Sequence, residues 1–403
     1  MVNRDWANIK RYYASFNLDQ FAVGLIGVFI NLFFFATQNY AAVLYFEIAT
    51  FIIAMVTYLL SSYVLRRYSP RYLYLIGLGL SILLLVDLLV ATGAMANVLI
   101  FGIIDGASIG IFYAGNNVIM YDITKRSNRT SFVAINNLIN GVVSLIAPVM
   151  AGVLIEFSAF SGVYRFFWDF LIAIVFFIVS AVLMLGIKQR GKFGVKYSIK
   201  STLIKAGKSY SKFNVYFVVS QVFSFAFGII LPIYVFQITG NYLVTGVFAS
   251  YEVLLYIAAN FIFRRGFSET GRFARYSVPG IVASSLIMLF PSAIPPPINA
   301  FIFAGVYTFL STPLDNRVSV EYMRFLDEHK SINRALFWAN REYYLTIGRV
   351  AILASMILLL YYITNTLSFV LILPVLSLYS LIYYKIIGIG KKISLEEKII
   401  GSK

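Results

Sequence analysis

The sequence has no cysteine and only one histidine, His329, among its 403 residues. The missing thiols exclude disulfides, thiolate zinc sites and cysteine nucleophiles. The chain also lacks a glycine-rich phosphate loop, so we expect neither a metal ion nor an organic cofactor. The same absences count against a membrane-embedded enzyme such as a lipid-linked transferase, which would need metal ligands or paired carboxylates in sizeable loops.

Charged residues are scarce as well, at 12% of the chain, whereas 60% of the residues are hydrophobic. The apolar residues form blocks of roughly 20 to 27, long enough to cross a hydrocarbon core of ~30 Å as helices. Alternating strand-length segments, which are typical of outer-membrane barrels, are absent. The sequence therefore predicts an all-α integral membrane fold with about twelve transmembrane helices. They are expected at 18–38, 41–65, 72–92, 97–121, 131–156, 166–187, 213–236, 243–263, 275–291, 298–318, 335–360 and 366–386.

The charges that are present have a strong excess of one sign, with 33 lysines and arginines against 17 acidic residues. If the N-terminus lies inside, every basic residue except Arg165, Arg341 and Arg349 falls in a segment that faces the cytoplasm. The positive-inside rule then predicts a multi-pass protein of the cell membrane with both termini cytoplasmic. The basic excess serves orientation and attraction to anionic membrane lipid, and we expect no nucleic-acid partner.

The chain is expected to consist of two similar halves. A strongly basic segment, 188–212, separates an N-terminal six-helix bundle at 1–187 from a C-terminal bundle at 213–403. The pattern Asn-Arg-x-x-Phe-x-Ala occurs at 128–134 and again at 333–339, and each copy opens an expected helix. Internal repeats of this kind are typical of secondary transporters, whose substrate site lies near the membrane midplane.

This arrangement resembles the major facilitator superfamily (MFS) over essentially the whole chain. The family's loop after its second helix commonly reads Gly-x-x-x-Asp-Arg-x-Gly-Arg-Arg, and the matching stretch here is 62–71, where Arg67 and Arg71 agree but Arg66 replaces the Asp. The stretch Ala147-Pro148-Val-Met-Ala151-Gly152 resembles the Gly-Pro-x-x-Gly-Gly of the family's antiporters. The resemblance implies a monomeric transporter, with a slight preference for efflux. Asp105 stands where the family's drug exporters often carry an arginine.

Ionisable residues inside the expected helices are the strongest functional signal. Each costs about 3 kcal/mol or more in hydrocarbon, so each needs a partner or a path to water. We expect Glu252, Asp105 and Glu47 to couple transport to a proton or another cation, because a membrane carboxyl group can bind and release a proton as its surroundings change. Asp87 and Asp169 lie nearer the outer surface, and we expect them to be solvated.

The helix expected at 335–360 contains three further candidates, Arg341, Glu342 and Arg349. Glu342 and Arg349 are seven residues apart and project from one face, whereas Arg341 points elsewhere. A guanidinium here would bind a carboxylate or phosphate of the substrate. The alternative is a structural ion-pair cluster with Asp105, Glu252 or Glu47.

Polar stripes on several helices indicate a hydrophilic path, because such stripes cannot face lipid. Glu252, Tyr256 and Asn260 form one stripe. Further candidate substrate ligands are Asn31, Asn116 and Asn140, and the expected cytoplasmic gate contains Arg67, Arg71 and two possible salt bridges, Asp122 with Arg129 and Asp315 with Arg334.

The predicted function is secondary active transport of a small solute by alternating access, with proton coupling and possible efflux. A lipid scramblase or flippase, or a uniporter on the same scaffold, is the alternative. Movement of lipid without an imposed gradient would distinguish a scramblase from a coupled transporter.

Overall fold

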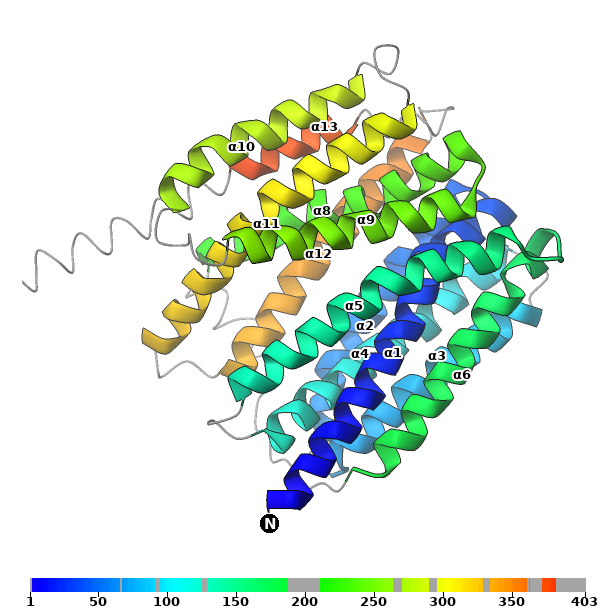
Figure 1. The fold of residues 1–403 in the computed structure, drawn as a ribbon, viewed down its shortest axis with the longest axis vertical. Coiled ribbons are helices and arrows are strands. Elements are labelled where there is room, and N and C mark those ends of the chain that lie inside the picture. The colour runs from blue at the N-terminus through cyan, green and yellow to red at the C-terminus, as the bar shows by residue number, and fades with distance from the viewer. Residues whose placement is uncertain are drawn as a thin grey trace, which may run out of the picture. The chain divides into compact units, whose positions relative to one another are not determined.

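A computed structural model describes residues 2–65, 67–90, 95–124, 129–187, 211–263, 270–289, 296–328, 334–360, 362 and 372–381. Within these ranges the regular structure is helical throughout, which confirms the predicted fold class (Figure 1). In the part of the chain that is described, ten helices are long and apolar enough to cross a membrane. The α-helices are α1 Val2–Thr37, α2 Tyr40–Val64, α3 Pro70–Val90, α4 Met95–Ile123, α5 Arg129–Glu156, α6 Phe167–Leu185, α8 Ser211–Thr239, α9 Tyr242–Phe263, α10 Thr270–Leu286, α11 Pro296–Glu328, α12 Arg334–Leu360 and α13 Ile372–Ser377, with short 3-10 helices η1 Gly162–Phe166, η3 Ile287–Leu289 and η5 Leu378–Leu381.

Three helices differ from the sequence prediction. α1 begins at Val2 instead of 18, and Tyr12 and Ser15 in the added segment are fully buried against neighbouring helices. α11 continues to Glu328, ten residues beyond the expected end at 318. The helix expected at 366–386 is described only at 372–381, where α13 changes to the tighter η5 after six residues. At that change the Ser377 hydroxyl donates to the Pro374 carbonyl, an alternative to the regular helical ladder.

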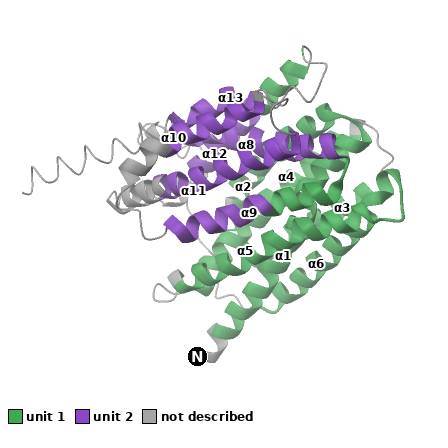
Figure 2. Ribbon diagram, turned by 45° about the horizontal axis from the view of Figure 1, so that its top comes forward, with its two compact units in different colours: residues 1–199, 240–250, 353–362 green, residues 200–239, 251–352, 363–403 purple. Residues whose placement is uncertain are grey.

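The chain forms two compact units, coloured separately in Figure 2. Unit 1 contains residues 1–199, 240–250 and 353–362, and unit 2 contains 200–239, 251–352 and 363–403. Of the basic segment expected at 188–212, residues 188–210 lie outside the described part of the chain. The repeated Asn-Arg-x-x-Phe-x-Ala element opens a helix in both copies as predicted, since α5 begins at Arg129 and α12 at Arg334.

In unit 1, α4 lies in direct backbone contact with α2. Gly102, Gly106 and Gly110 of α4 follow one another at every fourth position and line this seam. A Cβ atom on Gly102 would lie 2.7 Å from the Cβ of Ala49, and one on Gly106 would lie 3.0 Å from the Ala54 nitrogen. Small residues at this spacing allow two membrane helices to approach closely and pack by van der Waals contact. The seam holds α2 and α4 together as one rigid pair.

Buried hydroxyl and aromatic groups join the other helices of unit 1. α1 packs beside α5 and α6 (Figure 1). Ser15 of α1, Tyr74 of α3 and Ser180 of α6 form a fully buried hydroxyl cluster, in which the Ser15 hydroxyl donates to the Ser180 carbonyl at 2.8 Å. In the membrane these groups have no water to bond, so the cluster fixes the three helices relative to one another.

Unit 2 uses similar chemistry at different positions. The rings of Phe223, Phe227 and Tyr307 pack at tilted angles between α8 and α11, and the Tyr307 hydroxyl lies 3.2 Å from the hydroxyl of Tyr379 in η5. One kind of contact occurs in both units, namely a buried pair of asparagine side chains. Its members are Asn17 and Asn136 in unit 1, 3.2 Å apart, and Asn214 and Asn340 in unit 2, 2.8 Å apart.

The glycine seam generates a test of packing. We expect Gly106→Leu to lower the thermal unfolding midpoint of the purified protein, because overpacking of a tight contact costs roughly 1–3 kcal/mol. Gly79→Leu in α3 is the matched control, since an added Cβ at Gly79 meets no heavy atom within 4 Å. The measurement is thermal unfolding in detergent, followed by size-exclusion chromatography, and equal midpoints for the two variants would contradict the seam.

Candidate functional site

Amide and acidic side chains meet between α1 and α5 of unit 1. Asn140 of α5, a predicted ligand, donates to the Gln20 side chain at 3.5 Å and accepts from Ser144 at 3.4 Å. Gln20 in turn donates to the buried carboxylate of Asp19 at 2.9 Å. The structure therefore adds Asp19 and Gln20 to the candidate residues. Sequence analysis missed them because it placed the start of the first helix at 18, which put both at the membrane edge.

Two more predicted ligands lie in hydrogen bonds of unit 1. Asn31 of α1 donates to the buried Glu47 carboxylate of α2 at 2.7 Å. Asn116 of α4 is buried and accepts from the Tyr12 hydroxyl at 2.9 Å. Both amides therefore hold α1 against a neighbouring helix, and any role in solute binding comes in addition to this structural one.

Asp105 lies on the seam between α4 and α2, one residue before Gly106. The Thr50 hydroxyl of α2 approaches its carboxylate at 3.4 Å and the Gly102 carbonyl at 3.3 Å. In the described part of the chain no lysine or arginine pairs with Asp105. A carboxyl group that is held only by a hydroxyl differs from a structural ion pair, in which a cation would neutralise it.

Asp169 corrects the sequence analysis, which expected it to be solvated. Its side chain is fully buried, and neither carboxylate oxygen has a hydrogen-bond partner among the described residues. The reason is aromatic packing at the first turn of α6, where Phe33 of α1 closes against Phe166 and Phe170 with ring centroids 5.4 and 5.7 Å away. Position along the sequence placed Asp169 near the outer surface, but the partner helix excludes water.

In unit 2, Glu252 of α9 is half-buried, and its Oε1 atom is enclosed without a hydrogen-bond partner in the described ranges. Two turns further along, Asn260 accepts a 2.6 Å hydrogen bond from Asn316 of α11. Tyr256, the middle member of the predicted stripe, is 51% exposed. The three residues of the stripe therefore differ in their surroundings. In the described ranges Glu252 has an oxygen without a hydrogen bond, Tyr256 is exposed, and Asn260 joins α9 to α11.

Both arginines of α12 contact α8, although their helical spacing gives them different directions. Arg349 donates from Nε to the Gln221 side chain of α8 at 2.8 Å. Gly348 lies next to the α8 backbone at Val218, which explains how Arg349 comes so near to that helix. Arg341 pairs with Glu342 at 2.9 Å and stands 5.9 Å from the centre of the Phe217 ring.

The predicted gate residues have mixed positions. Arg71 donates to the carbonyls of Leu185 and Ile187 at the end of α6, at 3.0 and 3.4 Å. Arg11 of α1 donates to the adjacent Gly186 carbonyl. A guanidinium at a helix C-terminus satisfies carbonyl groups that lack partners within the helix and complements the helix dipole. Arg67 is exposed.

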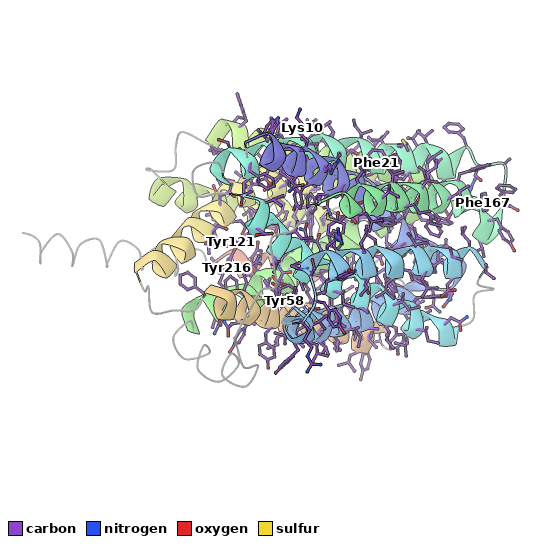
Figure 3. The ribbon with its side chains drawn as sticks, turned by 90° about the horizontal axis from the view of Figure 1, so that it is seen from below. Lys10, Phe21, Tyr58, Tyr121, Phe167 and Tyr216 are labelled. Carbon is purple, nitrogen blue, oxygen red and sulfur yellow. The ribbon has the colours of Figure 1, made fainter. Side chains whose placement is uncertain are left out.

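The two predicted salt bridges of the gate involve side chains outside the described part of the chain, those of Arg129 and Arg334. Asp122 is half-buried. Asp315 accepts a 2.6 Å hydrogen bond from Tyr216 of α8, which is labelled in Figure 3. Among the described residues no group of three or more acidic or histidine side chains could hold a metal ion.

Comparison with known proteins gives one family and several related folds. The family model described as Major Facilitator Superfamily matches residues 13–331. The structure of the nucleoside transporter NupG aligns with a TM-score of 0.70 at 11% identity, covering 95% of this chain and 99% of that one. A bacterial homologue of the iron transporter ferroportin, in an inward-facing state, aligns at 0.67 and 14% identity, covering 94% and 98%. A bacterial homologue of the human drug peptide transporters PepT1 and PepT2 aligns at 0.69 and 10% identity, covering 96% and 99%. Among curated proteins no sequence matches.

The contact between Arg349 and Gln221 can be tested by a double-mutant cycle. Arg349→Lys keeps the charge but removes the Nε–H donor, and Gln221→Leu removes the acceptor. We expect the double variant to lose less free energy of unfolding than the sum of the losses in the two single variants. The difference should be roughly 0.5–3 kcal/mol, as for other residues in contact. Gln237→Leu, further along α8, is the control that should combine additively with Arg349→Lys, and thermal unfolding in detergent measures both cycles.

Proposed function

The chain belongs to the major facilitator superfamily, a family of membrane transporters, and we propose that it is a secondary active transporter in which proton movement drives a small solute across the membrane by alternating access. Members of this family bind small molecules and typically work as monomers. The observation that supports proton coupling is that carboxyl groups in the membrane helices, above all Glu252, have few hydrogen-bond partners among the described residues.

Glu252 and Glu342 provide an internal contrast. Glu342 has an arginine neighbour at 2.9 Å, as expected of a carboxylate with a structural role. Glu252 has no such partner in the described ranges, and one of its oxygen atoms is enclosed without any hydrogen bond. A permanently charged group in this position would be costly, whereas a proton that binds and leaves would let the group alternate between neutral and charged forms. Asp105 and Glu47 are further coupling candidates.

The geometry of α12 supports an anionic or zwitterionic solute. Gln221 holds Arg349 through Nε, so the plane of the guanidinium is oriented by α8. An oriented guanidinium presents its terminal N–H groups in a fork that matches a carboxylate or phosphate. We propose Arg349 as the main contact of the solute in unit 2, with Arg341 and Glu342 beside it.

The location of the protein and the direction of transport are inferred from two further observations. The distribution of basic residues supports a place in the cell membrane with both termini cytoplasmic. In the stretch that resembles the family's antiporter motif, Gly152 packs against the backbone of Tyr242, whose carbonyl oxygen would lie 2.8 Å from an added Cβ. The resemblance of this stretch to the antiporter motif supports export in exchange for protons as the direction of transport.

Proton flux in proteoliposomes with a trapped pH dye tests the proposed function. Challenge with organic acids, sugars, amino acids and cationic drugs should give a solute-dependent pH change in the wild type. We expect Glu252→Gln to abolish this change and Arg349→Ala to weaken it for anionic solutes, because the first removes the proton site and the second the anion contact.

Asp87→Asn is the control variant, since Asp87 is a half-buried acid of α3 outside the proposed site. It should retain the wild-type flux. Solute uptake that does not depend on pH would instead indicate uniport, and lipid movement without a gradient would indicate a scramblase. Flux that survives in Glu252→Gln would exclude this residue as the coupling group.

The proposed orientation can be read by labelling, because the natural chain has no cysteine. A membrane-impermeant maleimide should label Ser158→Cys, between α5 and η1, in intact cells. It should label Ser402→Cys, near the C-terminus, only after the membrane is made permeable. Labelling of Ser402→Cys in intact cells would show that the C-terminus lies outside and would contradict the proposed orientation.

A further inference from the structure

Four side chains between α1 and α5 form a hydrogen-bond chain that runs in one direction. The Ser144 hydroxyl donates to the Asn140 carbonyl at 3.4 Å, and the Asn140 amino group donates to the Gln20 carbonyl at 3.5 Å. The Gln20 amino group then donates to Asp19 Oδ2 at 2.9 Å. Every donor in this chain, which we name the amide relay, points toward the carboxyl group of Asp19.

The direction of the amide relay follows from the chemistry of its end. A carboxylate can only accept hydrogen bonds, so the Gln20 amino group must face it. The Gln20 carbonyl then faces away and accepts from Asn140, whose own carbonyl accepts from Ser144. Asp19 therefore sets the orientation of two amides on two helices.

A proton on Asp19 would reverse this order without losing a hydrogen bond. A protonated carboxyl group donates, so the Gln20 carbonyl would turn to accept from it. The Gln20 amino group would then donate to the Asn140 carbonyl, and the Asn140 amino group would donate to the Ser144 oxygen. At the far end the Ser144 hydroxyl would lose its acceptor and would point its hydrogen outward.

The surroundings of Asp19 leave the relay as its main polar contact. Asp19 is 2% exposed, and no lysine or arginine pairs with it among the described residues. Its titratable neighbours are Tyr12 on its own helix and Tyr74 on α3. The hydroxyl of Tyr12 bonds Asn116, and that of Tyr74 lies in the cluster with Ser15 and Ser180. The α5 members of the relay, Asn140 and Ser144, are neutral, and they connect to Asp19 only through Gln20.

We propose that Asp19 is a proton-binding site of unit 1 and that the amide relay converts its protonation into a change of hydrogen-bond polarity at Ser144. This assignment rests on the proposed transport function and adds a residue to it. With anionic Asp19, the Ser144 oxygen is an acceptor for a donor group of the solute, such as an ammonium or a hydroxyl. With protonated Asp19, the Asn140 amino group takes one of the two lone pairs of the Ser144 oxygen, and the Ser144 hydrogen becomes free to donate. Protonation of Asp19 therefore weakens binding of a donor group of the solute at Ser144 and favours an acceptor group.

Infrared difference spectroscopy of the purified full chain during a pH titration tests the relay, with the proton as the only ligand. In the wild type we expect a carboxyl C=O band and side-chain amide bands that change with one common midpoint. Asp19→Asn should remove the carboxyl band and the amide response together. Gln20→Met, which has a similar shape but no amide, should keep the carboxyl band and lose the response of Asn140.

Asp87→Asn is again the control, and it should leave the common midpoint unchanged. Amide bands that still respond in Asp19→Asn, or a carboxyl band of Asp19 that titrates without any amide response, would overturn the relay. If Asp19→Asn does not fold, Gln20→Met alone decides between these outcomes. Because no solute is added, a negative result here is distinct from a failure of the flux assay, which tests transport itself.

Discussion

Hydrocarbon offers no hydrogen bonds, so every polar group of a membrane-spanning chain must find its partner inside the protein. This constraint explains the chemistry of the helix contacts. Asparagine pairs join α1 to α5 and α8 to α12, and a serine and tyrosine cluster joins α1 to α3 and α6. Among the described residues Asp105 and Glu252 depart from this rule, since a hydroxyl approaches the first and one oxygen of the second has no hydrogen bond, and this is why we propose them as coupling groups.

The same constraint determines what could be predicted from the sequence. Lipid excludes polar backbone, so long apolar blocks became helices at almost every expected place, and the repeated element opened α5 and α12. Ends that depend on protein contacts were harder to predict. α1 begins 16 residues early, and its added segment contains Tyr12 and Ser15, whose burial by neighbouring helices the polarity of this segment does not indicate.

Side-chain partners were the part that sequence analysis could not supply. The pairing of Arg349 with Gln221 joins residues 128 positions apart, and Asp169 is buried beside a contact between rings of α1 and the start of α6. Helical spacing predicted different directions for Arg341 and Arg349, yet both contact α8, because the identity of each partner depends on how the helices pack. Asp19 and Gln20 were lost for the same reason, because their depth depends on where α1 begins.

The hydrogen bonds from Arg11 and Arg71 to carbonyl groups at the end of α6 have a consequence for biosynthesis. Arg11 precedes its partner Gly186 by 175 residues. At roughly 5–20 residues per second, a ribosome needs about 9–35 s to make that stretch. Throughout this interval α1 is already made, but the carbonyl group that will bind Arg11 has not yet been synthesised. Asn17 likewise precedes its partner Asn136 by 119 residues. The first helix is therefore made well before its partners on α5 and α6, and unit 1, which also contains residues 240–250 and 353–362, is complete only later.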